Sequence, residues 1–305
     1  MRTTSYIIIG LASLGAVAAF GLGVWSGHET IVGQEGCAGI TIGFEKESKE
    51  VDRFSEFAVE VKVYCGDEKM WFQNKISVVF SESDSLERPV LSMSPEWNDY
   101  LTVNSTEGKL LIDVDFHSIC TESSKDENPD VGCLTLRDFT PSDIDIKVPK
   151  GMLRQLSGDE FVSLAFRDME RDSLSMDGTI SSMSFYNCRI GHLSMDGTMR
   201  TVGFERRRAY VAYIYPQVED IACVRMEESR VDSMAINAAA ADLVVITENS
   251  EIGMLAWTDA SDEKDQTAML DILGKGIDRI KWDSPLDNGL NCKFKSGSEL
   301  TIGVQ

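Results

Sequence analysis

A six-residue segment that occurs twice in the second half of the chain restricts the possible fold more than any other feature. Leu174–Thr179 (LSMDGT) recurs letter for letter as Leu193–Thr198, nineteen residues later. Looser copies, each an apolar-x-apolar triplet followed by a polar turn-forming residue, begin at Met234, Leu255 and Ile280. Spacings of about 19 to 25 residues, with two or three short strands in each, are typical of β units that stack and cover one another's apolar faces. The pattern predicts an all-β fold with a parallel β-solenoid, or β-helix-like, body.

Alternation of apolar and polar residues predicts further strands before these repeats. Phe57–Val63, Leu110–Phe116 and Ile144–Val148 place an apolar side chain at about every second position, and we expect those side chains to point inward. Asn104–Lys109 contains turn-forming residues and separates Leu101–Val103 from the row that starts at Leu110. This arrangement predicts a β-hairpin between Leu101–Val103 and the strand that starts at Leu110.

The first 27 residues have the composition of an export signal. Arg2 is the only charged side chain before Glu29, and Tyr6–Trp25 is an uncharged run of twenty residues. As a helix rising about 1.5 Å per residue, such a run matches a bilayer core of about 30 Å. Ala16–Ala18 has the small residues of a signal-peptidase site, but the apolar run continues past it, so cleavage and anchoring both stay open. We expect a signal peptide or transmembrane anchor and a cell-envelope location, periplasmic or surface-exposed.

Changes in pattern along the chain predict four segments. Residues 1–27 are the signal or anchor, residues 28–50 a linker, residues 51–150 an N-terminal β segment, and residues 151–305 the solenoid repeats.

The charge balance argues against one class of partner. The chain has 50 acidic and 29 basic side chains, a formal net charge of −21. Such a surface repels phosphate backbones, so we expect no nucleic-acid partner. The simpler interpretation of the acidity is that it keeps an exported protein soluble.

Seven cysteines are present, and none belongs to a CxxC pair, so no zinc-site spacing occurs. Cys120 and Cys133 bracket a polar stretch that we expect to be a loop between two strands. In an oxidising compartment these two residues are the best disulfide candidate. The alternative is that both are small buried thiols.

A basic cluster beside tyrosines is the most distinctive candidate binding surface. Arg206, Arg207 and Arg208 are followed by Tyr210 in an otherwise acidic chain. Guanidinium groups interleaved with aromatic rings bind anionic sugars or the carboxylates of a partner protein. The alternative is a solvated bulge, because a run of charge is usually an exposed face.

Asp177 and Asp196 occupy equivalent places in the two identical segments. Stacked carboxylates of this kind form turns, hold a cation such as calcium, or act as acid and base on a polysaccharide. The three histidines show no metal-binding spacing, and alternation predicts that His192 points to solvent. We therefore predict no metal, no cofactor and no catalytic residue.

Several segments together resemble the "putative auto-transporter adhesin, head GIN domain" family of exported bacterial proteins of unknown function. The likeness covers residues 52–305, and it rests on Phe54–Val59, Glu107–Ile112, Ile144–Pro149 and the Leu-Ser-Met-Asp-Gly-Thr segments. The chain departs from the family pattern by lacking the glycine of the opening strand around Val61 and a lipid-attachment cysteine after the signal. The resemblance implies an exported right-handed β-solenoid without established catalytic residues.

These observations favour a non-enzymatic, adhesin-like envelope protein that offers a β-solenoid surface to a protein or glycan partner and meets the membrane through its N-terminal segment. The alternative is a polysaccharide lyase or hydrolase on a β-helix, which requires clustered acids and bases in one groove. A sensor domain is a third possibility, although only five residues precede the apolar run.

Overall fold

A computed structural model of the chain describes residues 37–65, 68–69, 71–72, 75–119, 133–137, 144–180, 182–199, 221–239, 242–259, 267–274, 276–283, 289–294 and 301–302. The chain divides into two compact units, Met1–Cys37 and Ala38–Gln305, and nearly all of the described residues belong to the second. The predicted division into four segments stays a prediction.

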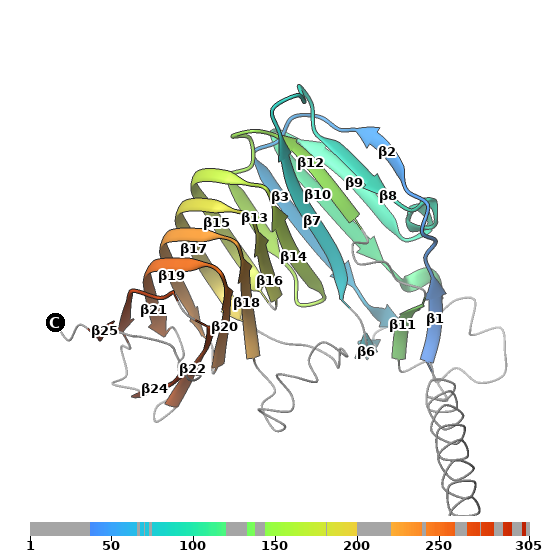
Figure 1. Cartoon of the computed structure of the whole chain (residues 1–305). Coiled ribbons are helices and arrows are strands. Elements are labelled where there is room, and N and C mark those ends of the chain that lie inside the picture. The colour runs from blue at the N-terminus through green and yellow to red at the C-terminus, as the bar shows by residue number, and fades with distance from the viewer. Residues whose placement is uncertain are drawn as a thin grey trace, which may run out of the picture. The chain divides into compact units, whose positions relative to one another are not determined.

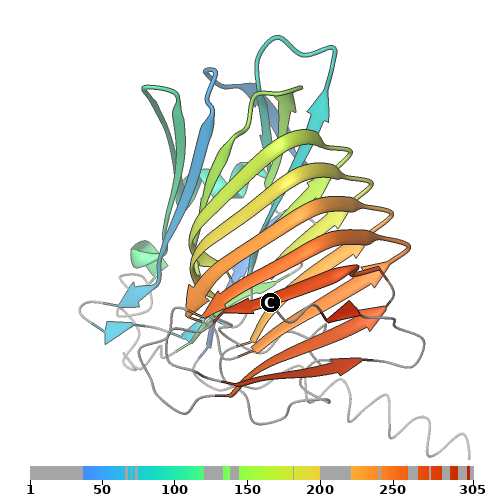
Figure 2. The same ribbon diagram turned by 90° about the vertical axis from the view of Figure 1, so that its left-hand side faces the viewer.

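Most described strands belong to two ten-stranded sheets, which we name sheet 1 and sheet 2 (Figures 1 and 2). The order of sheet 1 is β25 (Thr301–Ile302), β23 (Arg279–Asp283), β21 (Glu251–Asp259), β19 (Arg230–Ala239), β17 (Arg189–Met199), β15 (Glu170–Ile180), β13 (Gln155–Gly158), β3 (Glu56–Lys62), β10 (Lys109–Asp115) and β9 (Leu101–Thr106).

Sheet 2 has the same number of strands. Its order is β2 (Glu47–Glu50), β8 (Val90–Met93), β12 (Ile144–Pro149), β7 (Ile76–Ser83), β14 (Val162–Arg167), β16 (Ser182–Tyr186), β18 (Ile221–Glu227), β20 (Asp242–Glu248), β22 (Thr267–Gly274) and β24 (Gly289–Phe294).

Two smaller sheets and a short helix are also present among the described residues. A three-stranded sheet has the order β1 (Cys37–Thr41), β11 (Cys133–Arg137) and β6 (Trp71–Phe72). A two-stranded sheet joins β4 (Tyr64–Cys65) to β5 (Glu68–Lys69). The 3₁₀ helix η1 (Pro95–Asp99) leads into β9 and buries Trp97.

From β13 onward, each strand lies in the opposite sheet from the strand before it, and neighbours within a sheet are parallel. The yellow to orange strands of Figure 2 lie side by side in this way. The two identical segments pair residue for residue, with Leu174 opposite Leu193 and Asp177 opposite Asp196. The next strand continues the register, with Met234 opposite Leu193.

Antiparallel pairing makes both large sheets mixed and contradicts the predicted fold class. The hairpin predicted between Leu101–Val103 and Leu110–Ile112 is confirmed, since β9 and β10 are antiparallel with Val103 opposite Ile112. In sheet 2, β8 is antiparallel to both β2 and β12. The prediction of a right-handed parallel β-solenoid is therefore wrong, because the antiparallel strands precede the repeats, and the repeat pattern carries no information about how those earlier strands pair.

The predicted signal or anchor helix is not seen, because residues 1–27 lie outside the described residues. No helix in the described part of the chain is long and apolar enough to cross a membrane.

The core lies between the two sheets and consists of columns of similar side chains. Phe57 of sheet 1 meets Phe80 of sheet 2 edge-on, with ring centroids 4.9 Å apart. Within sheet 2, the rings of Phe80, Phe166 and Phe185 stack in sequence at 5.6 and 5.0 Å. Stacked aromatic pairs add about 0.5 to 1.5 kcal/mol beyond the area that they bury. The in-register pairing of parallel strands creates this column, since it places Phe80, Phe166 and Phe185 at matching positions.

The strands of sheet 1 bend near their beginnings. In β17, Ile190 and Leu193 are buried while Gly191 and His192 between them face outward, so the alternation is interrupted. The exposed His192 agrees with its prediction. A Cβ atom on Gly191 would stand 2.7 Å from the carbonyl oxygen of Asp172 in β15. Only glycine therefore allows the two backbones to approach this closely at the bend.

The corners that lead from sheet 2 into sheet 1 share one backbone conformation. Asp168, Asn187, Glu228 and Asn249 all have φ between 49° and 53°, in the left-handed region. Asparagine and aspartate tolerate this region better than other residues with side chains. Asn187 Nδ2 also donates to Asp168 Oδ1 at 2.6 Å, which joins one corner to the next.

At three of these corners the next residue, Cys188, Ser229 or Ser250, is small and buried. The backbone N–H of Cys188 donates to Ser229 Oγ at 2.9 Å, and the N–H of Ser229 donates to Ser250 Oγ at 3.0 Å. Ser229 Oγ donates in turn to the carbonyl oxygen of Glu227 at 2.8 Å. Each hydroxyl thus satisfies a buried backbone group that the turn leaves without a partner in the sheet.

Replacing Ser229 by Ala tests this chain of hydrogen bonds. The substitution removes the acceptor of the buried Cys188 N–H, and we expect the free energy of unfolding to fall by about 1 to 3 kcal/mol. Ser233→Ala, in the strand β19 that follows Ser229 and half-exposed, should change it by no more than about 0.5 kcal/mol. Urea unfolding measures both, and equal losses for the two variants would show that the hydroxyl chain has no special role.

Cys188 supports a second prediction, on pH. Burial raises the pKa of its thiol from 9.0 to about 11. The unfolded chain therefore loses this proton first, and the stability contributed by the neutral thiol declines as pH rises from about 9 to 11, by roughly 2 to 3 kcal/mol.

Cys188→Ser is the matched variant. Its hydroxyl can donate to the Tyr186 carbonyl, 3.3 Å from the present sulfur, as Ser229 does to Glu227. We expect stability at pH 7 within about 1 kcal/mol of the original chain and a smaller loss between pH 9 and 11. Parallel pH curves of unfolding free energy for the two proteins would contradict the burial argument.

Candidate functional site

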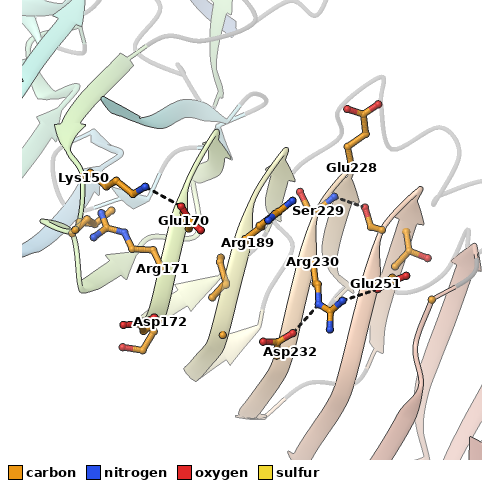
Figure 3. A pocket seen from close by; sticks show the side chains of 18 of the residues that line it. Lys150, Glu170, Arg171, Asp172, Arg189, Glu228, Ser229, Arg230, Asp232 and Glu251 are labelled. Atoms are coloured by element: carbon orange, nitrogen blue, oxygen red, sulfur yellow. Dashed lines mark hydrogen bonds and ion pairs between the residues drawn. The ribbon is translucent and has the colours of Figure 1, made fainter. Parts of the chain in front are cut away.

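A groove of about 1810 Å³ runs across the beginnings of β15, β17, β19 and β21 (Figure 3). Residues at these strand starts and in the loop between β12 and β13 line it. The groove therefore follows the bends of sheet 1, where the strands turn out of the corners.

Charged side chains dominate the lining, and their signs balance. The five cations are Lys150, Arg154, Arg171, Arg189 and Arg230. The five acids are Glu170, Asp172, Glu228, Asp232 and Glu251. Because the whole chain carries −21, this groove repels an anion far less than the average surface does.

One register position supplies four of these charges. Glu170, Arg189, Arg230 and Glu251 begin four neighbouring strands of sheet 1 and lie opposite one another in turn. Figure 3 shows Arg189 between Glu170 and Arg230 along this row. The order of charge is acid, base, base, acid, so two guanidinium groups stand side by side in the middle of the groove.

Ion pairs hold the outer members of the row. Lys150 Nζ lies 2.9 Å from Glu170 Oε2, and the hydrogen bond between them lowers the pKa of Glu170 and raises that of Lys150. Arg230 lies 2.9 Å from Asp232 and 3.4 Å from Glu251, and its hydrogen bond with Asp232 raises its pKa. All of these groups are well exposed, so the pairs orient side chains more than they stabilise the fold.

Arg171 forms a different, buried ion pair at one end of the groove. Its Nη2 lies 2.8 Å from Glu82 Oε1, and both side chains are only 4% exposed. Glu82 also accepts backbone N–H bonds from Gly151 at 3.0 Å and Glu170 at 2.8 Å. Burial lowers the pKa of Arg171, and the facing charge of Glu82 opposes this shift. The pair joins the end of β7 to β15 and to the loop after β12.

Arg154 and Arg189 differ from the other cations of the groove. Within the described residues, neither guanidinium group makes a hydrogen bond or an ion pair. The carboxylates of Asp172 and Glu228, which also line the groove, likewise make no hydrogen bond or ion pair within the described residues. The groove thus offers unpaired groups of both signs to a ligand.

The structure places Asp177 and Asp196 outside this lining. They are opposite each other in β15 and β17, as the repeat suggests. Asp177 accepts a hydrogen bond from Gln155 Nε2 at 2.9 Å, and Asp196 accepts one from Asn237 Nδ2 at 3.1 Å. Each carboxylate therefore has an amide donor on the strand away from the other. Within the described part, no group of three or more His, Cys, Asp and Glu residues is arranged to hold a metal ion.

Of the other predicted site residues, the structure describes only Cys133. Arg206, Arg207, Arg208 and Tyr210 lie outside the described residues, and so does Cys120. Cys133 begins β11. The binding cluster and the Cys120–Cys133 disulfide therefore stay predictions.

Sequence reasoning missed the groove, although one signal was present. The position three residues before each inward triplet is aliphatic at Ile190, Val231, Ile252 and Ile277, all of which are buried. Arg171 occupies the equivalent position in β15, opposite Ile190. A charged residue in an aliphatic column indicates a buried partner, but Glu82 is too distant in sequence to be recognised as that partner.

No family model matches this chain, and no curated protein matches it. Similar solved structures include a "putative adhesin" of Bacteroides fragilis, with 10% identity and a TM-score of 0.39 over 86% of this chain and 99% of that one. A "putative lipid binding protein" of Parabacteroides distasonis has 14% identity and a TM-score of 0.37 over 88% and 100%. A "putative adhesin" of Parabacteroides merdae has 10% identity and a TM-score of 0.38 over 87% and 99%.

Proteins described as adhesins are thus among the structural neighbours, but TM-scores of 0.37 to 0.39 carry no argument about function. The resemblance to the head GIN family is not confirmed.

Arg171→Met tests the buried ion pair. The substitution leaves the Glu82 carboxylate buried without its cation, and we expect a loss of about 3 to 5 kcal/mol in the free energy of unfolding. Adding Glu82→Gln removes the uncompensated charge and should recover part of that loss. Arg154→Met, an exposed arginine of the same groove, is the control, with an expected change within about 0.5 kcal/mol. Similar losses for the two single variants in urea unfolding would refute this account.

Proposed function

We propose that this chain is an exported, non-enzymatic, adhesin-like protein of the cell envelope that binds a protein or glycan partner. The observation that carries this proposal is the charged groove across β15, β17, β19 and β21. Its side chains begin successive strands of one sheet, which is a rigid arrangement suited to an extended ligand.

The electrostatics of the groove support binding over catalysis. A polysaccharide hydrolase, one of the two alternative activities, needs a carboxyl group that holds a proton near neutral pH. The ion pair with Lys150 instead lowers the pKa of Glu170, and Asp232 and Glu251 are neutralised by Arg230. Asp177 and Asp196, the carboxylates first considered for such chemistry, are not among the residues that line the groove.

Features that lie wholly or partly outside the described residues complete the proposal. The apolar run within residues 1–27 supports export and attachment to the membrane. The arginines at 206–208 with Tyr210 remain a proposed second binding element for the same kind of partner, and Cys120 with Cys133 a proposed disulfide of the exported chain.

Blocking the groove with one large side chain tests the proposal. The full chain in mild detergent is screened against a glycan array and against envelope proteins, and released sugar ends are assayed in parallel. Ser173 lines the groove, and we expect Ser173→Trp to weaken binding of the captured partner at least about tenfold.

Ser175→Trp is the matched control, because Ser175 is exposed on the same strand but does not line the groove. It should bind as the original chain does. If the original chain releases sugar ends and Asp177→Asn does not, the alternative enzymatic function would be established instead.

A further inference from the structure

Two arginines stand opposite each other on neighbouring strands of the groove, which is an unfavourable arrangement unless their charges are compensated. Arg189 of β17 pairs in register with Arg230 of β19. Adjacent strands lie about 4.8 Å apart, and like charges directly opposite each other destabilise a sheet. The stability of this arrangement therefore depends on which carboxylates neutralise the charge of each arginine.

Arg230 has two carboxylates of its own. Asp232 lies two residues further along the same strand, at 2.9 Å, and Glu251 lies opposite on β21, at 3.4 Å. The charge of Arg230 is thus neutralised within the sheet.

Arg189 has no equivalent partner. The position two residues after it is Gly191, where a side chain would meet the carbonyl oxygen of Asp172 at 2.7 Å. Its neighbour on the other side, Glu170, is close enough for the charge of Arg189 to lower its pKa, but the hydrogen bond and ion pair of Glu170 are made with Lys150, at 2.9 Å. The bend of the strand, which requires glycine, therefore excludes the carboxylate that would neutralise Arg189.

We propose that Arg189, with Arg230 beside it, is a carboxylate-binding subsite that receives the acidic sugars of a glycan chain lying in the groove. This inference rests on the proposed binding function and names its ligand class. The planar guanidinium fork matches a carboxylate in two parallel hydrogen bonds. A carboxylate between the two arginines supplies the missing compensation.

The remaining polar groups of the groove favour a glycan over an acidic peptide. Asp172 and Glu228 are groove acids without an ion pair among the described residues, and they are hydrogen-bond acceptors. The hydroxyl groups of a sugar donate to such acceptors, whereas ionised aspartate and glutamate side chains have no hydrogen to donate to them. A uronic acid unit, with one carboxylate and several hydroxyls, satisfies both kinds of group.

Isothermal titration of the full chain tests this subsite. The probe is a hexamer of galacturonic acid, its methyl ester is the uncharged control ligand, and a hexaglutamate peptide represents the competing ligand class. We expect the acid to bind at least about tenfold more tightly than the ester, as one charge-assisted hydrogen-bonded pair implies. Arg189→Gln should reduce binding of the acid to the level of the ester.

Two further variants separate recognition from folding. Arg167→Gln removes the same charge from β14, outside the groove lining, and should leave affinity unchanged. Asp232→Asn releases Arg230 from one of its carboxylates, so we expect the acid to bind several times more tightly, a gain that a damaged fold cannot produce.

Two results would overturn the subsite in different ways. Undiminished binding of the acid by Arg189→Gln, or tighter binding of hexaglutamate, would refute the assignment while leaving the proposed binding function in place. If no probe binds, the subsite is refuted, and the proposed function is then decided by the Ser173→Trp comparison alone.

Discussion

Parallel, in-register pairing of most strands in the two large sheets is the constraint on which the rest of the structure depends. Each strand places its residues directly opposite those of its neighbour. The side chain at one position must therefore be compatible with the side chains at the same register position of the adjacent strands. Inside, this requirement is favourable, since Phe80, Phe166 and Phe185 stack ring on ring. Outside, the same geometry forces charges to face one another, as Arg189 and Arg230 do. The charged side chains that face one another on neighbouring strands line the groove.

The bends and corners decide which of the facing charges can be compensated. A residue in the left-handed region starts four of the corners, and at two of them the buried serine that follows, Ser229 or Ser250, accepts a buried backbone N–H. Further along the strand, the bend demands glycine wherever the preceding carbonyl comes too close, as at Gly191. Backbone geometry therefore controls side-chain chemistry two residues away, because it fixes where a carboxylate can stand beside an arginine.

Local features were predicted well from the sequence, whereas contacts between residues that are distant in the sequence were predicted poorly. Alternation identified the inward residues Leu110, Ile112 and Val114, and the turn residues identified the hairpin of β9 and β10, because both signals lie within a few neighbouring residues. The identical hexapeptides do face each other, yet the repeat could not reveal that the sheets are mixed. The groove depends on contacts such as that of Arg171 with Glu82, which joins distant parts of the chain and leaves no local pattern.

Net charge is a poor guide to what this surface can bind. At −21 the chain as a whole repels anions, but the lining of the groove has equal numbers of cations and acids. A groove with balanced charge draws no ligand from a distance by its field, so its contribution lies in the match of individual hydrogen bonds rather than in the rate of encounter. Selectivity in such a site depends on which groups remain unpaired after the internal ion pairs form. In this chain the bend of one strand determines that outcome, because it places glycine where a neighbouring strand has aspartate.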